Sequence, residues 1–301
     1  MEEGFAGNVP YPFYAMAIAV LRQVKRALSN LNPRDVRATA DRPVRIGLVA
    51  ASAESMGRME TYFAPAHLSP QRRAEVVRML VRGGGFGCDI EIYESSLLRP
   101  TRAFSFDPEA PEDCVRRILR TREDLTLALA RNLYPFRKPA AHHVIRTVAK
   151  ENAMFCLATA LPDIVPSLAS LPWAAGEFGS DAAFLTMNQI RMAFQLAAAS
   201  DRTVGYREQK SEIASIVAGA FGWRALAREL VGKVPFGGGL IPKAGIAYAG
   251  TFAVGVSLER LYRLGYGFTR VERRAVYEEA YEHGRQIAGT LLDGLRQRKA
   301  V

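Results

Sequence analysis

The stretch from Glu177 to Leu264 is the part of the sequence that most limits how this chain can fold. Its pattern of apolar residues predicts three helices, which are too apolar to stand alone in water and must pack on one another or on lipid. In order, the predicted elements are a helix over Ser180–Ala199, a polar turn over 200–206, a helix over Arg207–Lys233, a glycine-proline corner over Val234–Pro242 and a helix over Lys243–Leu264. The stretch therefore predicts a helical bundle.

The first of these helices carries a polar stripe on an otherwise apolar surface. Asn188, Arg191 and Gln195 recur at intervals of three and four residues, which places them on one helix face. An unpaired buried amide costs about 1 to 3 kcal/mol and a lone buried guanidinium costs more, so we expect Glu177, Asp181 or helix-end carbonyls to pair with the stripe. Two interpretations stay open, a satisfied polar network in the bundle core and a ligand site.

The third helix has a broad face of small side chains. The small residues of this face and the row beside it are Gly245, Ala247, Ala249, Gly250, Thr251, Ala253, Gly255 and Ser257. Such faces allow close helix packing in bilayers, and they also occur inside soluble bundles. From Val234 to Leu258 only Lys243 is charged, which meets the length of about 20 residues that crosses a bilayer. We predict a helix that is either buried in protein or inserted shallowly in a membrane.

Composition favours a globular protein of two domains with acidic partners. Of 301 residues, 49% are hydrophobic and 23% are charged, and the formal net charge is +10. This charge favours anionic lipid or nucleic acid, although an arginine-rich surface without such a ligand explains it equally well. Three scattered cysteines and four histidines show no metal-ligand spacing, so we expect no metal and no cofactor. Residues 1–10 lack the features of a signal peptide.

Residues 1–134 are predicted to hold a basic amphipathic helix with its linker (1–43) and a small α/β domain (44–134). The helix either docks on the next domain or lies on a membrane surface. The domain is predicted to contain a strand over Val44–Ala50, a helix over Leu68–Arg82 closed by three glycines, and a strand over Cys88–Tyr93 that pairs with the first. Helices then lead to Leu133, and Tyr134–Pro139 is predicted to break the chain near a domain boundary.

The eight residues that begin at Ser52 align with a phosphate-binding loop, but they match it poorly. Only Gly57 is retained as the motif requires, and Arg58 keeps a positive charge. Met59 cannot ligate magnesium, and Glu54 places a carboxylate where phosphate would sit. Ser52, Gly57 and Arg58 are therefore candidates for nucleotide binding by a degenerate loop, and the alternative is an ordinary strand–loop–helix.

Four segments of the second half resemble a known type of domain. They are Phe184–Met192, Gly219–Arg224, Leu240–Gly245 and Ala249–Thr251. Together they resemble the bacterial YcjF-type domain of unknown function, which is commonly found at the end of Era-like GTPases and in predicted inner-membrane proteins. The resemblance covers residues 140–264 and implies an all-helical bundle beside a GTPase-like module near a membrane. It implies no reaction or catalytic residue, and GTP hydrolysis is not carried over because the first domain lacks the nucleotide motifs.

These observations predict a mainly α protein, with a small N-terminal α/β domain of two or three strands, a helical bundle (140–264) and a C-terminal helix (265–301). The leading functional hypothesis is a bacterial, non-enzymatic module that associates with a membrane surface, with another protein or with itself as a homo-oligomer. Its expected location is the cytoplasmic side of the inner membrane, peripheral or integral. The alternatives are a nucleotide-binding switch and a nucleic-acid-binding protein, and the lack of interleaved aromatic residues argues against the latter.

Overall fold

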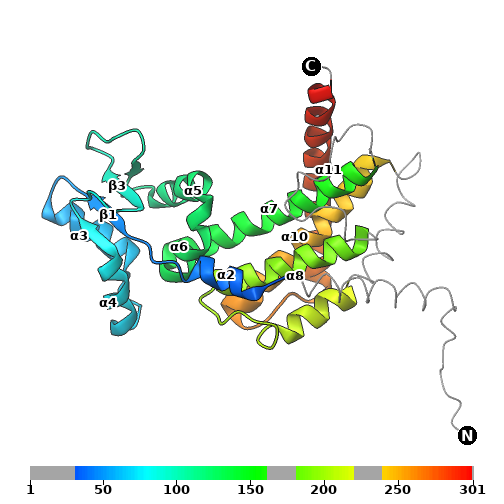
Figure 1. Ribbon diagram of the computed structural model, residues 1–301, viewed down its shortest axis with the longest axis horizontal. Coiled ribbons are helices and arrows are strands. Elements are labelled where there is room, and N and C mark those ends of the chain that lie inside the picture. The colour runs from blue at the N-terminus through cyan, green and yellow to red at the C-terminus, as the bar shows by residue number, and fades with distance from the viewer. Residues whose placement is uncertain (1–30, 161–180, 220–238, 300–301) are drawn as a thin grey trace, which may run out of the picture.

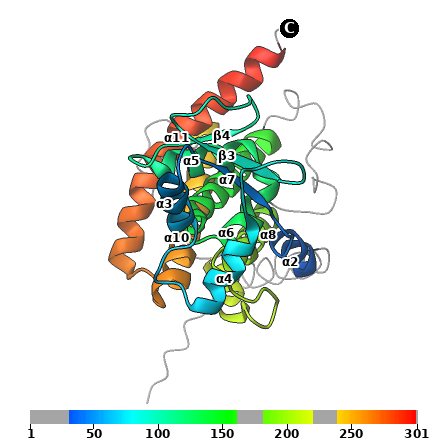
Figure 2. The same ribbon diagram turned by 90° about the vertical axis from the view of Figure 1, so that its left-hand side faces the viewer.

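The computed structural model describes residues 31–160, 181–219 and 239–299. It is mainly helical with a small parallel sheet on the N-terminal side, which confirms the predicted fold class. The sheet lies at one end of a helical bundle, beside the first turns of the long helix α7 (Tyr134–Ala160), as Figures 1 and 2 show. The predicted N-terminal helix lies outside the described residues.

The sheet contains four strands in the order β2-β1-β3-β4, and all neighbours are parallel. The strands are β1 (Ile46–Val49), β2 (Leu80–Arg82), β3 (Ile90–Glu94) and β4 (Phe104–Phe106). The predicted pairing of the first and third of these is confirmed, with Ile46 opposite Ile90. The helix predicted to reach Arg82 is too long, because α4 (Pro70–Met79) ends where β2 begins. Strands of three residues such as β2 and β4 are too short to show a period of two in the sequence.

The run of glycines after β2 carries the chain across β1. β2 and β3 pair with opposite edges of β1, so the short connection between them must pass over that strand. Gly83, Gly84 and Gly85 have positive φ angles, which glycine adopts without strain. A Cβ atom on Gly47 of β1 would lie only 2.7 Å from the Cα atom of Gly84. Glycine both on β1 and in the connection that follows β2 therefore permits the crossing.

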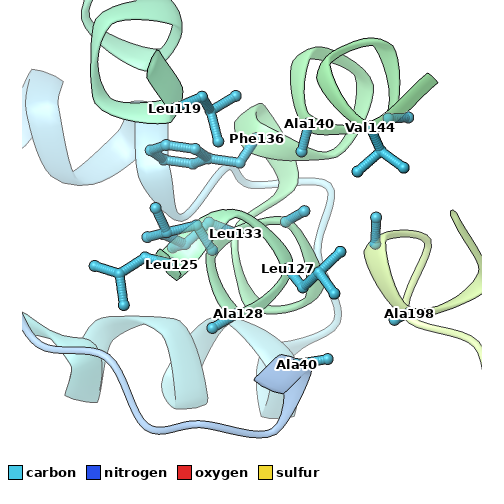
Figure 3. Close-up of a cluster of buried hydrophobic side chains, with 14 of the residues drawn as sticks. Ala40, Leu119, Leu125, Leu127, Ala128, Leu133, Phe136, Ala140, Val144 and Ala198 are labelled. Carbon is cyan, nitrogen blue, oxygen red and sulfur yellow. The ribbon is translucent and has the colours of Figure 1, made fainter. Parts of the chain in front are cut away.

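Short helices join the sheet to the bundle. They are α2 (Pro33–Ala40), α3 (Ala53–Phe63), α5 (Pro111–Thr121) and α6 (Thr126–Asn132). Figure 3 shows α6 in the middle of a buried cluster, where Leu127 and Ala128 lie between Ala40, Ala198 and side chains of α7. One hydrophobic cluster thus includes residues from both sides of the predicted domain boundary.

The predicted chain break over Tyr134–Pro139 is wrong, because α7 runs without interruption from Tyr134. Pro135 lies in the first turn, where a backbone N–H would have no helical partner and its absence costs little. Pro139 lies inside the helix, where it removes one backbone hydrogen-bond donor without ending the helix. The ring of Phe136, between these prolines, stacks on that of Phe63 at a centroid distance of 6.2 Å and anchors α7 to the α/β part.

The bundle is built around α10 (Leu240–Leu264), which packs against α7, α8 (Asp181–Ala199) and α11 (Arg270–Lys299). The predicted bounds of α8 are correct to one residue. The helix predicted over Arg207–Lys233 is described only in part, as helical over 210–219. Pro242 was assigned to the corner before the third helix, but it lies in the first turn of α10, a position that proline tolerates.

Candidate functional site

The residues predicted to bind nucleotide lie at the start of α3, where they have structural roles. The side chain of Ser52 accepts a hydrogen bond from the backbone N–H of Ser55 and caps the helix. The helix begins directly after Ser52, so Gly57 lies inside it, with no atom within 4 Å of the position of a Cβ. Arg58 forms an ion pair with Glu54 at 3.4 Å. This segment is therefore a capped helix start, and nucleotide binding by these residues stays a prediction.

A carboxylate of the protein occupies the position at the start of α3 that would suit a phosphate. Glu94, at the end of β3, accepts hydrogen bonds from the backbone N–H of Ala51 at 2.8 Å and from the Ser55 hydroxyl at 2.9 Å. These two bonds lower the pKa of Glu94, so the side chain is held as an anion. The N-terminus of a helix favours negative charge, and here the chain supplies it.

The polar stripe of α8 enters a buried network that joins three helices. Asn188 donates a hydrogen bond to Asn152 of α7 at 2.8 Å, and Asn152 donates one to Thr251 of α10 at 2.7 Å. Gln189 donates to the same Thr251 hydroxyl at 3.3 Å. All four side chains are buried, so the network holds α7, α8 and α10 in one relative position. The pattern within α8 could not identify Asn152, because it lies on another helix.

The other stripe residues differ in their partners. Arg191 forms an ion pair with Glu151 of α7, a residue that the sequence analysis did not consider. Glu177 lies outside the described residues, and Asp181 is the first residue of α8, with a side chain that is not described. The side-chain oxygen of Gln195 is buried and has no hydrogen-bond partner within the described part of the chain.

The small-residue face of α10 is covered by helices of the same chain. A Cβ on Gly245 would lie 3.1 Å from Arg285 of α11, and one on Gly255 would lie 2.7 Å from Ile145 of α7 and 3.0 Å from Met192 of α8. Other residues of the face that are buried are Ala247, Ala249, Gly250, Thr251 and Ala253, whereas Ser257 is partly exposed. The helices thus approach closely at this face, and it is not left open for another molecule.

Among the described residues, α10 is also the one helix that is long and apolar enough to cross a membrane. Half of its most apolar stretch is buried inside the protein. Length and hydropathy alone do not distinguish a membrane-spanning helix from the central helix of a soluble bundle. Because α7, α8 and α11 pack around α10, its surroundings are those of a central bundle helix.

An exposed, arginine-rich surface is formed by residues 260–274, which we call the basic corner. It comprises the last turn of α10, the connection over 265–269 and the first turn of α11. It carries five arginines and one glutamate. Three large apolar side chains are exposed there, namely Leu264 (43%), Tyr266 (57%) and Val271 (80%). The arginines can be counted in the sequence, but the exposure of the apolar side chains is visible only in the structure.

Local interactions hold the basic corner in one conformation. Thr269 donates its backbone N–H to Glu272 at 2.8 Å, and its hydroxyl accepts the backbone N–H of Glu272 at 3.3 Å, so the two residues form a capping box. Arg260 pairs with Glu272 at 2.8 Å and lies over the rings of Tyr266 and Phe268, at 5.1 and 4.6 Å from their centroids. The Thr269 N–H and Arg260 lower the pKa of Glu272 to about 2.

Comparisons of the chain with protein-family models, with curated proteins and with solved structures found no match. The resemblance to the YcjF-type domain therefore stays a prediction. Within the described ranges, no group of three or more His, Cys, Asp or Glu side chains is placed to hold a metal ion.

Proposed function

We propose that this protein is a peripheral membrane-docking module, which contacts an anionic lipid surface through the basic corner. The observation that carries the proposal is the combination of five arginines with exposed Leu264, Tyr266 and Val271 within the 15 residues of the basic corner. Each arginine near an anionic membrane contributes about 1 kcal/mol of attraction. Apolar side chains that enter the interface add the free energy of their removal from water.

The rigidity of the corner supports this role. The capping box at Thr269 and the stacking of Arg260 on two aromatic rings hold Tyr266 at the surface. A side chain that is already held in an exposed position loses little conformational entropy when a surface binds it. The anionic lipids of the cytoplasmic leaflet suit this charge, which agrees with the location expected from the sequence.

The contacts of α10 favour peripheral attachment over a membrane-crossing helix. Insertion of α10 into lipid would separate it from α7, α8 and α11, and it would break the hydrogen bonds of Thr251 with Asn152 and Gln189. A peripheral protein keeps these contacts. Extraction of membranes at alkaline pH distinguishes the two, because it releases a peripheral protein and leaves an integral one in the pellet.

Vesicle co-sedimentation of the full chain tests the proposal. We expect binding to vesicles of phosphatidylcholine with phosphatidylglycerol and much weaker binding to phosphatidylcholine alone. The double variant Tyr266→Ser, Val271→Ser removes two exposed apolar side chains from the corner and is expected to weaken binding at least about tenfold. The matched control is Phe86→Ser, Leu98→Ser, which removes an exposed aromatic and an exposed aliphatic side chain from the α/β part. Equal loss in both variants, or equal binding to both vesicles, contradicts the proposal.

A further inference from the structure

A cleft of about 660 Å³ lies between α7, α10 and α11. Tyr248, Phe252 and Val256 recur every four residues on α10 and form a mostly apolar row along it. Arg146 of α7 and Glu279 of α11 line the cleft from the helices on either side of that row. The volume is within the range of pockets that hold small molecules.

Tyr248 is the most unusual side chain in the cleft. None of its surface is exposed to solvent, yet its hydroxyl has no hydrogen-bond partner in the part of the chain that the structure describes. Burial raises the pKa of Tyr248, and the positive charge of Arg146 partly offsets the rise, so the guanidinium is within electrostatic reach of the hydroxyl. Buried hydroxyls normally have an acceptor, and this one lacks it.

The charges that line the cleft are mostly neutralised by the protein. Arg263 pairs with Glu259 at 2.7 Å, and Arg260 pairs with Glu272 at the basic corner. Arg146 is exposed and forms no ion pair with any described residue. The cleft thus combines a hydroxyl without an acceptor, a cation without a counter-ion and an apolar row, which are the features that recognise an acid with an apolar chain.

We propose that this cleft binds a small amphiphile that carries an acidic group. The acid oxygens accept hydrogen bonds from the Tyr248 hydroxyl and from Arg146, and the chain lies along Phe252, Val256 and Val276. The exposed side chains of Arg146 and His283 move aside to admit the acid to the buried hydroxyl. Glu279 lines the same cleft and opposes the ligand charge, which limits the affinity. This proposal does not depend on membrane docking by the basic corner.

Calorimetric titration of the full chain without vesicles tests the proposal, with monomeric decanoate and lysophosphatidylglycerol as probes and decanol as the uncharged comparison. Tyr248→Phe and Arg146→Gln are each expected to weaken binding of the acidic probe about tenfold, because each removes a hydrogen bond to a charged group. Glu279→Gln is expected to strengthen it. Lys150→Gln, one turn from Arg146 on α7 and outside the cleft lining, is the matched control and should change nothing.

The thermal midpoint without ligand gives a second measurement. Tyr248→Phe removes only a hydroxyl that lacks a partner, so the variant is expected to be at least as stable as the wild type. The proposal is supported if either acidic probe binds and the binding is weakened in the Tyr248 and Arg146 variants. Binding of lysophosphatidylglycerol but not of decanoate would identify the ligand as a phospholipid. Equal binding of decanol, unchanged affinity in both variants, or no binding of either acid overturns it. The variant Tyr266→Ser, Val271→Ser should keep decanoate binding, which separates this site from membrane docking.

Discussion

The middle of α10 and its C-terminal end differ in what covers them. In the middle, Gly255 and its neighbours are covered by α7 and α8, so closely that a single added carbon would clash with Ile145. At the end, the basic corner exposes Tyr266 and Val271 among five arginines. A helix face of small residues is therefore not by itself a binding surface for another molecule, because other helices of the same chain can cover it.

At the start of α3 the chain also supplies its own partner, and here the interaction is electrostatic. A helix N-terminus attracts an anion, and Glu94 supplies one there from the chain itself. The basic corner attracts anions too. Arg260, Arg263 and Arg274 pair with Glu272, Glu259 and Glu278, and over residues 259–278 five arginines stand against these three glutamates, which leaves a surplus of positive charge. Positions with an internal partner have structural roles, and the position with a surplus of charge is the better candidate for an external one.

The largest effect is expected from filling the contact in the middle of α10. Gly255→Leu places a side chain where Ile145 and Met192 already lie, and overpacking of this kind destabilises a fold by about 3 kcal/mol. Urea unfolding measures the loss. The control is Gly289→Leu in α11, where no atom lies within 4 Å of the added Cβ, and which should be neutral or stabilising. Equal stability of the two variants would show that the face is not tightly covered.

A smaller effect is expected from removing charge at the basic corner. Arg273→Gln with Arg274→Gln should weaken binding to anionic vesicles about thirtyfold, at about 1 kcal/mol for each arginine near the surface. Added salt should reduce the difference between variant and wild type. The matched control is Arg116→Gln with Arg117→Gln, an exposed pair of adjacent arginines on α5. If both pairs have the same effect, binding depends on the net charge of the protein and not on the corner.

The smallest effect is expected at the start of α3. The pKa of Glu94 is lowered in the folded state, so its contribution to stability is present above the ordinary value of 4.5 and is lost as the pH falls below it. Glu94→Gln should therefore lower the thermal midpoint at neutral pH, and the difference from wild type should shrink in acid. Thermal scans from neutral to acidic pH measure this change. A difference that does not depend on pH would mean that the charge of Glu94 is unimportant.

Thermal scans in the presence of nucleotides test the alternative hypothesis that this segment binds nucleotide. With Glu94 at the helix start, we expect no thermal shift of the wild type with GTP, ATP or their diphosphates. A shift that Arg58→Ala abolishes would restore nucleotide binding as a function of this segment.

Much of the bundle could be predicted from the sequence because long helices have a clear period. The predicted bounds of α8 agree with the structure to one residue, and the predicted start of α10 is three residues too late. Short strands, and segments whose structure depends on the position of a proline or glycine, were missed. Proline in the first turn of α7 gives the same signal as a chain break, and the glycines after β2 give the same signal as a helix end. Local patterns do not distinguish these cases.

The amino-acid pattern alone establishes that this protein is mainly helical, that α10 carries small residues in rows, and that residues 260–274 are rich in arginine. Helical period, side-chain size and charge are properties of neighbouring residues, and they can be read along the chain. The folded structure was needed to show that Asn188 contacts Asn152, that Gly255 faces Ile145, and that Tyr266 is exposed. These contacts join residues far apart in the chain, and which of them form depends on how whole helices pack.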